Sequence, residues 1–199
     1  MYTTFKDKLM TKEDIITLPN LHLREKSRRV ENITQEIRKI VDDMISATLD
    51  WDDSREHEVG VALAAVQIDR LYQIVIVRND YEDKENRSFT VFINPEITKK
   101  EGKIVTDYEG CLSVPFIYGK VKRYSKVRVK AIGIDGKPFK ITAEGFLARI
   151  FQHEIDHNKG KLFIDHIKET HDAFFRLDEN GKLIQLDYEE IRNNNIFWE

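Results

Sequence analysis

The pattern most able to carry chemistry in this sequence is His153-Glu154-Ile155-Asp156-His157, an H-E-x-x-H arrangement. In a helix, histidines four positions apart lie one turn apart on the same face, so both imidazoles can bind one metal ion. The glutamate between them can reach a water molecule beside that ion and act as a general acid and base. The pattern therefore predicts a metal-dependent hydrolase, and the alternative is a solvated histidine pair on a helix surface.

A catalytic zinc-type site needs a third protein ligand, and the sequence offers more than one. In one class of metalloprotease the motif extends to H-E-x-x-H-x-x-G-x-x-H, but here Phe163 stands where the third histidine belongs. Another class of metalloendopeptidase uses a more distant glutamate, for which Glu169 and Glu179 are available. Cys111 lies between Gly110 and Pro115, which favour a turn that could direct a thiolate toward the helix. The residues alone leave a metal ligand and an inert core cysteine equally open.

A third segment, residues 60–68, is rich in small residues and carries the amide side chain of Gln67 near its end. Taken alone, it favours a tightly packed strand. Together, however, the three segments resemble the peptide deformylase family, whose members combine G-x-G-x-A-A-x-Q, E-G-C-L-S and Q-H-E-x-D-H motifs in this order. The matching stretches are residues 60–67, 109–113 and 152–157. The leading helix and the C-terminal hairpin are similar to those of the longer type found among Gram-positive members.

The resemblance implies a role for each member of the site. It implies that Cys111, His153 and His157 bind one divalent metal ion, Fe²⁺ above all, with Zn²⁺, Ni²⁺ or Co²⁺ as alternatives. Glu154 is then the general acid and base, and the Gln67 amide and the Leu112 backbone N–H stabilise the oxygen of the tetrahedral intermediate. The implied substrate-binding residues are Gly60, Val61, Ala62, Gly110 and Ile150.

The implied substrate is a nascent polypeptide that begins with N-formylmethionine, and the products are formate and a free amino terminus. An amide is a poor electrophile, so an ion that polarises its oxygen and lowers the pKa of water from 15.7 toward ~7 suits this reaction. A thiolate and two imidazoles bind Zn, Fe, Co or Ni, so ligand type does not select the ion.

Several positions depart from the family pattern, namely Ala62, Tyr118, Arg149 and Asn158. Arg149 lies one turn before His153, where many relatives carry an apolar residue in the methionine pocket. We expect the Arg149 side chain to extend outward to solvent, because long cationic side chains bury the stem and keep the charge in water. Ile150 and Phe146 would then form the apolar wall of the pocket.

Hydrophobic periodicity predicts the elements that must position these residues. Residues 27–49 have the spacing of an amphipathic helix that covers a sheet, and residues 143–158 form a second helix that Gly160 can end. Strands are expected at 73–78, 89–94, 127–134 and 138–142, the last two joined by a hairpin turn at Asp135-Gly136. Residues 174–177 and 182–186 form another hairpin, followed by a short helix or a frayed tail.

The fold class that follows is α+β: mostly antiparallel sheets around the helix that bears the H-E-x-x-H motif, with an N-terminal covering helix. A length of 199 residues predicts one catalytic domain, residues 1–199, with residues 172–199 as a C-terminal hairpin and tail. The balance of 32 Lys and Arg against 35 Asp and Glu gives a net charge of −3, which predicts no direct binding of nucleic acid. We interpret the basic stretch 120–130 as the solvated face of a strand.

Localisation and partners follow from what the sequence does not contain. No apolar run approaches the ~20 residues that cross a bilayer, so we expect no membrane association. The amino terminus lacks the apolar stretch of a secretory signal, and we expect a cytoplasmic protein. The ribosome is a candidate partner, although the tail after Tyr188 is not basic.

Three alternatives to a deformylase remain at this stage. A metalloendopeptidase would share the H-E-x-x-H motif and cleave internal peptide bonds. A cysteine hydrolase would use Cys111 as its nucleophile and would tolerate a chelator. A non-catalytic homologue that binds metal or peptide would have no need of Glu154.

Overall fold

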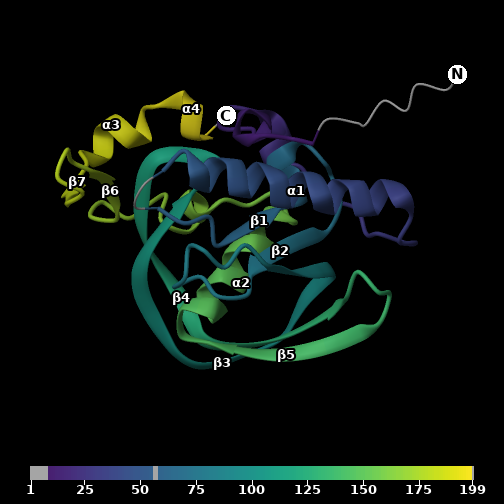
Figure 1. Cartoon of the computed structure of the whole chain (residues 1–199). Helices are drawn as coiled ribbons and strands as arrows, with labels where there is room; N and C mark the ends of the chain where they lie inside the picture. The colour runs from purple at the N-terminus through teal and green to yellow at the C-terminus, as the bar shows by residue number, and fades with distance from the viewer. Residues whose placement is uncertain (1–8, 56–57, 199) are drawn as a thin grey trace, which may run out of the picture.

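The computed structural model describes residues 9–55 and 58–198 (Figure 1). Its helices are α1 (Gln35–Asp53), α2 (Gly145–His157), α3 (Tyr188–Arg192) and α4 (Asn195–Trp198). Its strands are β1 (Ala62–Ala64), β2 (Ile74–Arg78), β3 (Phe89–Cys111), β4 (Val114–Ile132), β5 (Pro138–Glu144), β6 (Phe174–Leu177) and β7 (Leu183–Gln185). Short 3-10 helices lie at η1 (Lys12–Asp14), η2 (Leu21–Arg24), η3 (Ala65–Ile68) and η4 (Phe163–His166).

The strands of the described residues form one antiparallel sheet in the order β1-β2-β3-β4-β6-β7, and β5 pairs with β4 beside this path. Strands β3 and β4 make a long hairpin that curves around α2 (Figure 1). Register shifts interrupt their pairing at several points, and such irregularities bend strands. The α+β class, with an antiparallel sheet system around the H-E-x-x-H helix, is confirmed.

Helix α1 covers one face of the sheet, as its amphipathic pattern predicted. Its buried face packs on β1, β2 and η3 through a cluster that includes Met44, Leu63 and Ile76. The helix begins later than residue 27 because Thr34 caps it, with its side chain accepting a hydrogen bond from the Ile37 N–H. The earlier apolar position, Val30, is buried without being helical, since its backbone exchanges two hydrogen bonds with the Asn94 side chain, each 2.8 Å long.

Helix α2 packs on the opposite face, so the middle of the sheet is covered on both sides. Alternation along β2 shows this directly: Ile74 and Ile76 join the α1 cluster, whereas Val75 and Val77 join the cluster that contains Ile150 and other α2 residues. All five β2 residues are therefore buried. Most residues of α2, including both histidines, are themselves buried, so the helix has little freedom to move them.

The strand predictions were correct in kind and often too short. The Asp135-Gly136 turn joins β4 to β5 as predicted, and Gly136 supplies the required positive φ of 82°. Strand β3, however, continues beyond the predicted residue 94 as far as Cys111. Strand β4 begins at Val114, well before the predicted residue 127. Within residues 60–68 only 62–64 is strand; residues 65–68 form η3, and residues 60–61 belong to neither element.

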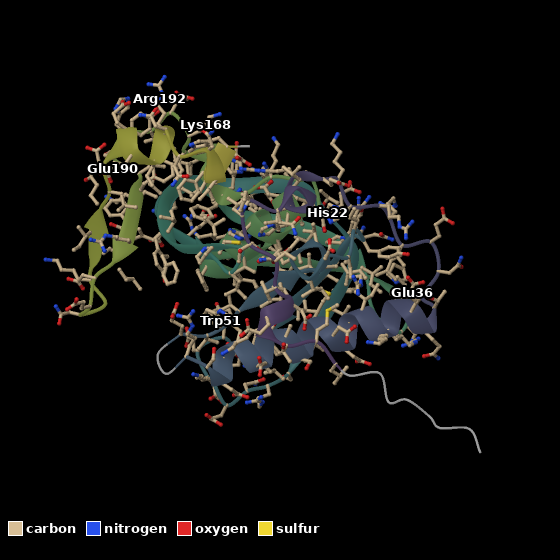
Figure 2. The ribbon with its side chains drawn as sticks, turned by 90° about the horizontal axis from the view of Figure 1, so that it is seen from above. His22, Glu36, Trp51, Lys168, Glu190 and Arg192 are labelled. Carbon is tan, nitrogen blue, oxygen red and sulfur yellow. The ribbon has the colours of Figure 1, made fainter. Side chains whose placement is uncertain are left out.

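The C-terminal elements lie at one end of the molecule. In Figure 2, helix α1 runs from Glu36 on one side of the molecule to Trp51 on the other. The segment that carries Glu190 and Arg192 lies on the Trp51 side. The predicted hairpin is present as β6 and β7, and a short helix, α3, follows it. Across residues 9–55 and 58–198, no helix is both long and apolar enough to span a membrane. The amino-terminal stretch 1–8, for which the sequence predicts no secretory signal, lies outside the described residues.

Candidate active site

Cys111, His153 and His157 meet at the centre of the molecule. One ligand atom from each lies within 4.8 Å of the others, and Cys111 Sγ is 3.3 Å from His157 Nε2. The two imidazole rings, one turn apart on α2, have centroids 5.0 Å apart. Cys111 is the last residue of β3, where the two-residue turn Leu112-Ser113 leads into β4. The turn, rather than an open loop, therefore brings the sulfur to the helix.

Glu109 orients the first of these histidines. Its Oε2 lies 3.0 Å from His153 Nδ1, which leaves Nε2 as the ring atom free to bind an ion. Burial alone would raise the pKa of Glu109, but hydrogen bonds from His153 and Arg123 outweigh it and lower that pKa well below its usual range. The sequence shows Glu109 only as part of a motif, because its partner is 44 positions away.

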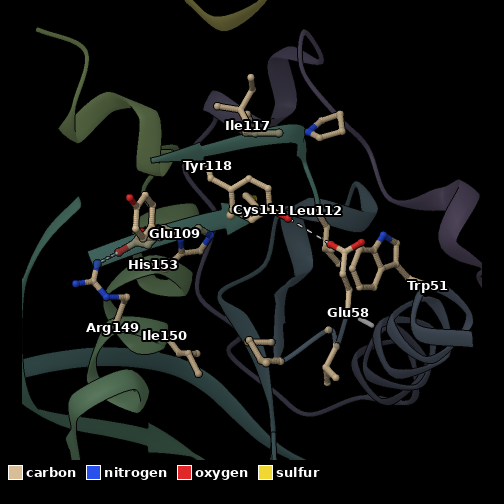
Figure 3. Close-up of a pocket in the computed structure, with 18 of the residues that line it drawn as sticks. Trp51, Glu58, Glu109, Cys111, Leu112, Ile117, Tyr118, Arg149, Ile150 and His153 are labelled. Carbon is tan, nitrogen blue, oxygen red and sulfur yellow. Dashed lines mark hydrogen bonds and ion pairs between the residues drawn. The ribbon is translucent and has the colours of Figure 1, made fainter. Parts of the chain in front are cut away.

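Two arginines hold the Glu109 carboxylate. Arg123 donates from Nε to Oε1 at 2.9 Å and from Nη2 to Oε2 at 3.0 Å. Arg149 donates from Nη1 to Oε1 at 2.7 Å (Figure 3). Arg123 is buried, so the interpretation of residues 120–130 as a solvated face is wrong at this position. Its guanidinium also contacts Asp156, which in turn pairs with His166. Within the described residues, Asp156 makes no hydrogen bond to either site histidine.

The expectation that Arg149 extends to solvent is also wrong. The residue is 6% exposed, and its guanidinium donates to the backbone carbonyls of Val105, Asp107 and Val121 as well as to Glu109. These carbonyls belong to β3 and β4, so Arg149 ties α2 to both strands of the long hairpin. A buried carboxylate and several strand carbonyls provide the acceptors that water would otherwise supply.

Glu154 is buried beside Cys111, His153 and His157, the three residues we call the triad. Its Oε2 accepts no hydrogen bond within the described part of the chain. Burial raises the pKa of Glu154 to about 7, although the nearby positive charge of His153 opposes this. The two histidines differ: burial and the charge of His153 lower the pKa of His157, whereas hydrogen bonds to Cys111 and Glu109 overcome burial and raise the pKa of His153. A thiol, two imidazoles and an unpaired carboxylate oxygen fit a divalent ion with a water beside it.

Gln67 approaches the triad from η3. Its Oε1 accepts a hydrogen bond of 2.9 Å from the Ala64 N–H, and its Nε2 donates to Ser113 Oγ at 3.2 Å and lies 3.6 Å from Cys111 Sγ. The side chain is therefore a hydrogen-bond donor at the edge of the site. Leu112, at the turn, is half-buried next to it in the same cavity.

A single cavity of about 650 Å³ connects these residues (Figure 3). It includes every sequence-predicted site residue except His157, which is fully buried: Gly60, Val61, Ala62, Gln67, Gly110, Cys111, Leu112, Ile150, His153 and Glu154. Residues that the sequence did not single out line it as well, from α1, β3, β4 and the C-terminal hairpin: Trp51, Tyr108, Phe116, Leu177 and Leu183.

A family model described as polypeptide deformylase matches residues 12–173. The chain belongs to the polypeptide deformylase family. It is 41% identical over 164 residues to a peptide deformylase of Syntrophobacter fumaroxidans, which covers 82% of this chain and 91% of the relative. It is 40% identical over 163 residues to a peptide deformylase of Nitrobacter hamburgensis, which covers 80% and 89% respectively.

Solved deformylases share the fold. The crystal structure of a peptide deformylase from Legionella pneumophila aligns with a TM-score of 0.68 and 38% identity over 80% of this chain and 86% of that one. The resemblance inferred from three short motifs is thus confirmed over most of the chain. As a deformylase, the chain is a hydrolase that removes the N-formyl group from nascent polypeptides, and metal dependence is general to the family. The family match ends at residue 173, just before β6.

Proposed function

We propose that the chain removes the formyl group of N-formylmethionyl peptides by using Cys111, His153 and His157 to hold one divalent ion and Glu154 as general acid and base. The observation that carries this assignment is the convergence of one sulfur and two imidazole nitrogens within 4.8 Å. The buried and unpaired Oε2 of Glu154 lies on the same helix between the two histidines. An inert core cysteine would have no reason to meet both imidazoles.

We propose Fe²⁺ as the ion on the strength of the family resemblance, and the donor set accepts Zn²⁺, Ni²⁺ and Co²⁺ as alternatives. Such an ion, when bound, polarises the formyl oxygen and makes water a better nucleophile near neutral pH. The Glu109 contact to His153 Nδ1 holds the ring so that Nε2 points to the other two ligand atoms.

Glu154 moves the proton in this proposal. Burial raises its pKa to about 7, so the carboxylate can accept a proton from the attacking water and return it to the departing amine nitrogen. The C–N bond breaks as the nitrogen receives that proton, which gives formate and a free amino terminus. Gln67 Nε2 and the Leu112 N–H then stabilise the negative charge that develops on the formyl oxygen.

The remaining assignments concern the peptide and its setting. We assign peptide binding to Gly60, Val61, Ala62, Gly110 and Ile150, all of which line the cavity. Ile150 is 4% exposed and offers an apolar surface for the methionine side chain. Because the substrate is a nascent chain, we propose that the protein acts in the cytoplasm and that the ribosome is where it meets this substrate.

The variant Glu154→Gln tests the assignment, because it removes the acid and base while preserving the shape of the side chain. We expect bound metal to stay at about one ion per chain and formate release from a formyl-Met peptide to fall by about 10²- to 10⁴-fold. Metal content and formate are measured on the same anaerobic preparation.

The matched control is Glu169→Gln, which changes a surface carboxylate that a distant-glutamate metalloendopeptidase could have used as its third ligand. It should leave both readouts unchanged. Unaltered formate release by Glu154→Gln would contradict the role of Glu154. Activity that survives a chelator but not a thiol alkylator would instead favour a cysteine hydrolase.

A further inference from the structure

The cavity extends well beyond the triad onto a strip of apolar side chains, which we call the apolar rim: Tyr108, Phe116, Leu177 and Leu183. Three of them are exposed large hydrophobic residues, at 36% for Tyr108, 76% for Phe116 and 38% for Leu177. Isolated exposed hydrophobic residues need no explanation, but several that gather on one wall of a cavity indicate a binding surface.

The C-terminal hairpin supplies half of the rim. Strand β6 adds to β4 through the pairs Tyr118 with Phe175 and Gly119 with Phe174, which fixes the hairpin against the wall of the cavity. Within the hairpin Leu177 pairs with Leu183, so the two side chains project on the same face. This face lines the cavity, and the hairpin lies at the same end of the molecule as Trp51, which lines it too (Figures 1 and 2).

Aromatic contacts hold this wall in place. The rings of Tyr108 on β3 and Phe175 on β6 meet edge to face with centroids 5.1 Å apart. Lys120 Nζ lies 5.5 Å from the first ring centroid and 4.7 Å from the second. Such aromatic and cation–π contacts stabilise the arrangement. The hairpin is therefore a built part of the cavity.

Phe116 adds an independent observation. Its φ of 65° places a bulky residue in the left-handed region, which costs free energy and is rare outside functional sites. Strands β4 and β6 are antiparallel and pair Tyr118 with Phe175. Phe116 is two residues before Tyr118 and Leu177 is two residues after Phe175, so both lie on the same side of that pair along the sheet. The polar groups nearby have partners: Glu58 accepts a hydrogen bond from the Tyr118 hydroxyl at 3.3 Å (Figure 3). Glu58 also pairs with Arg55 at 3.4 Å.

We propose that the apolar rim is a substrate subsite that binds an apolar side chain of the nascent peptide downstream of its formylmethionine. This inference rests on the proposed function, because the peptide must enter the cavity with its formyl group at the triad. The cavity is continuous from the triad to the rim, so the chain that follows the methionine runs along it. Leu177 and Leu183 lie beyond residue 173, where the family match ends, so the half of this subsite that the hairpin supplies belongs to the part of the chain that the family model does not include.

Position-scanned peptides test the subsite. The reference is formyl-Met-Ser-Ser-Ser, and three further peptides replace the serine at the second, third or fourth position by leucine. We expect kcat/KM of the metal-loaded wild type to rise about tenfold for at least one leucine peptide, the effect of burying most of one leucine side chain. In the double variant Leu177→Ser, Leu183→Ser this preference should fall to less than about threefold, mainly through KM.

The matched control is Ile184→Ser, on the opposite face of the same hairpin, where Ile184 pairs with Arg176 and is 41% exposed. This variant should keep the wild-type preference and activity. The subsite would be overturned if the ratio of kcat/KM for the leucine peptides to that for the reference peptide were near one at every position, or if the double variant kept the wild-type ratio. In either case, formate release from the reference peptide would still uphold the deformylase assignment. No formate from any peptide would refute the assignment and the subsite together.

Discussion

Replacing Arg149 by methionine should lower the free energy of unfolding by about 2–3 kcal/mol. The guanidinium makes one bond of 2.7 Å to the Glu109 carboxylate and donates to three strand carbonyls. Removing one partner of an isolated buried ion pair costs about 3–5 kcal/mol. Here Glu109 keeps both bonds from Arg123, and the methionine stem refills part of the volume, so the expected loss lies below that range.

Urea denaturation of the metal-loaded protein measures this loss, and a thermal melt should show a decrease of about 5–10 °C for a chain of this length. Arg123→Met should cost more, about 3–5 kcal/mol, because it removes two bonds to Glu109 and one of the partners of Asp156. Arg38→Met, on the exposed face of α1, should change stability by less than about 0.5 kcal/mol. If Arg149→Met were as stable as the wild type, or if the order of the two buried arginines were reversed, the reasoning about the Glu109 network would be refuted.

Two further predictions concern catalysis and acid stability. Gln67→Leu should lower kcat for a formyl-Met peptide by about 10²- to 10³-fold with little change in metal content, because it removes one donor aimed at the developing negative charge; an unchanged kcat would exclude Gln67 from that role. Burial would raise the pKa of Asp156, but bonds from His166 and Arg123 lower it from 3.8 to about 2, so its contribution to stability is present above pH 4 and is lost as the pH falls toward 2. The difference, 3.8 − 2 or about 2 pKa units, corresponds to about 2 kcal/mol, and urea titrations between pH 5 and 2 should show a shallower decline for Asp156→Asn than for the wild type.

Local sequence signals accounted for the parts of the fold that local physics determines. The Asp135-Gly136 turn was predictable because the hairpin needs a positive φ that glycine adopts freely. Helix α2 was predictable because Ile150, Phe151 and Ile155 repeat at helical spacing. The outer halves of β3 and β4 were not predicted, since many of their side chains face solvent and the register shifts break the alternation by which a strand is recognised.

The candidate site shows the same division. The triad and Glu154 could be proposed from motifs, because the spacing within α2 is local and the family resemblance supplied the cysteine. Glu109 was given no role, and Arg123 and Arg149 were expected to face solvent, because each side chain's environment depends on partners 14 to 44 positions away. A charged residue in a strand or on a helix carries no sign of whether its partner will be water or another buried group.

The two ends of the Gln67 amide are not interchangeable. The Ala64 N–H occupies the carbonyl end, so a half-turn of the amide would set two donors against each other there and bring an oxygen toward the cysteine sulfur. The backbone of η3 thus selects one rotamer in advance. In the role proposed for Gln67, the amide nitrogen therefore faces the Cys111 side of the cavity before a peptide enters, and the side chain needs no rotation as the bond breaks.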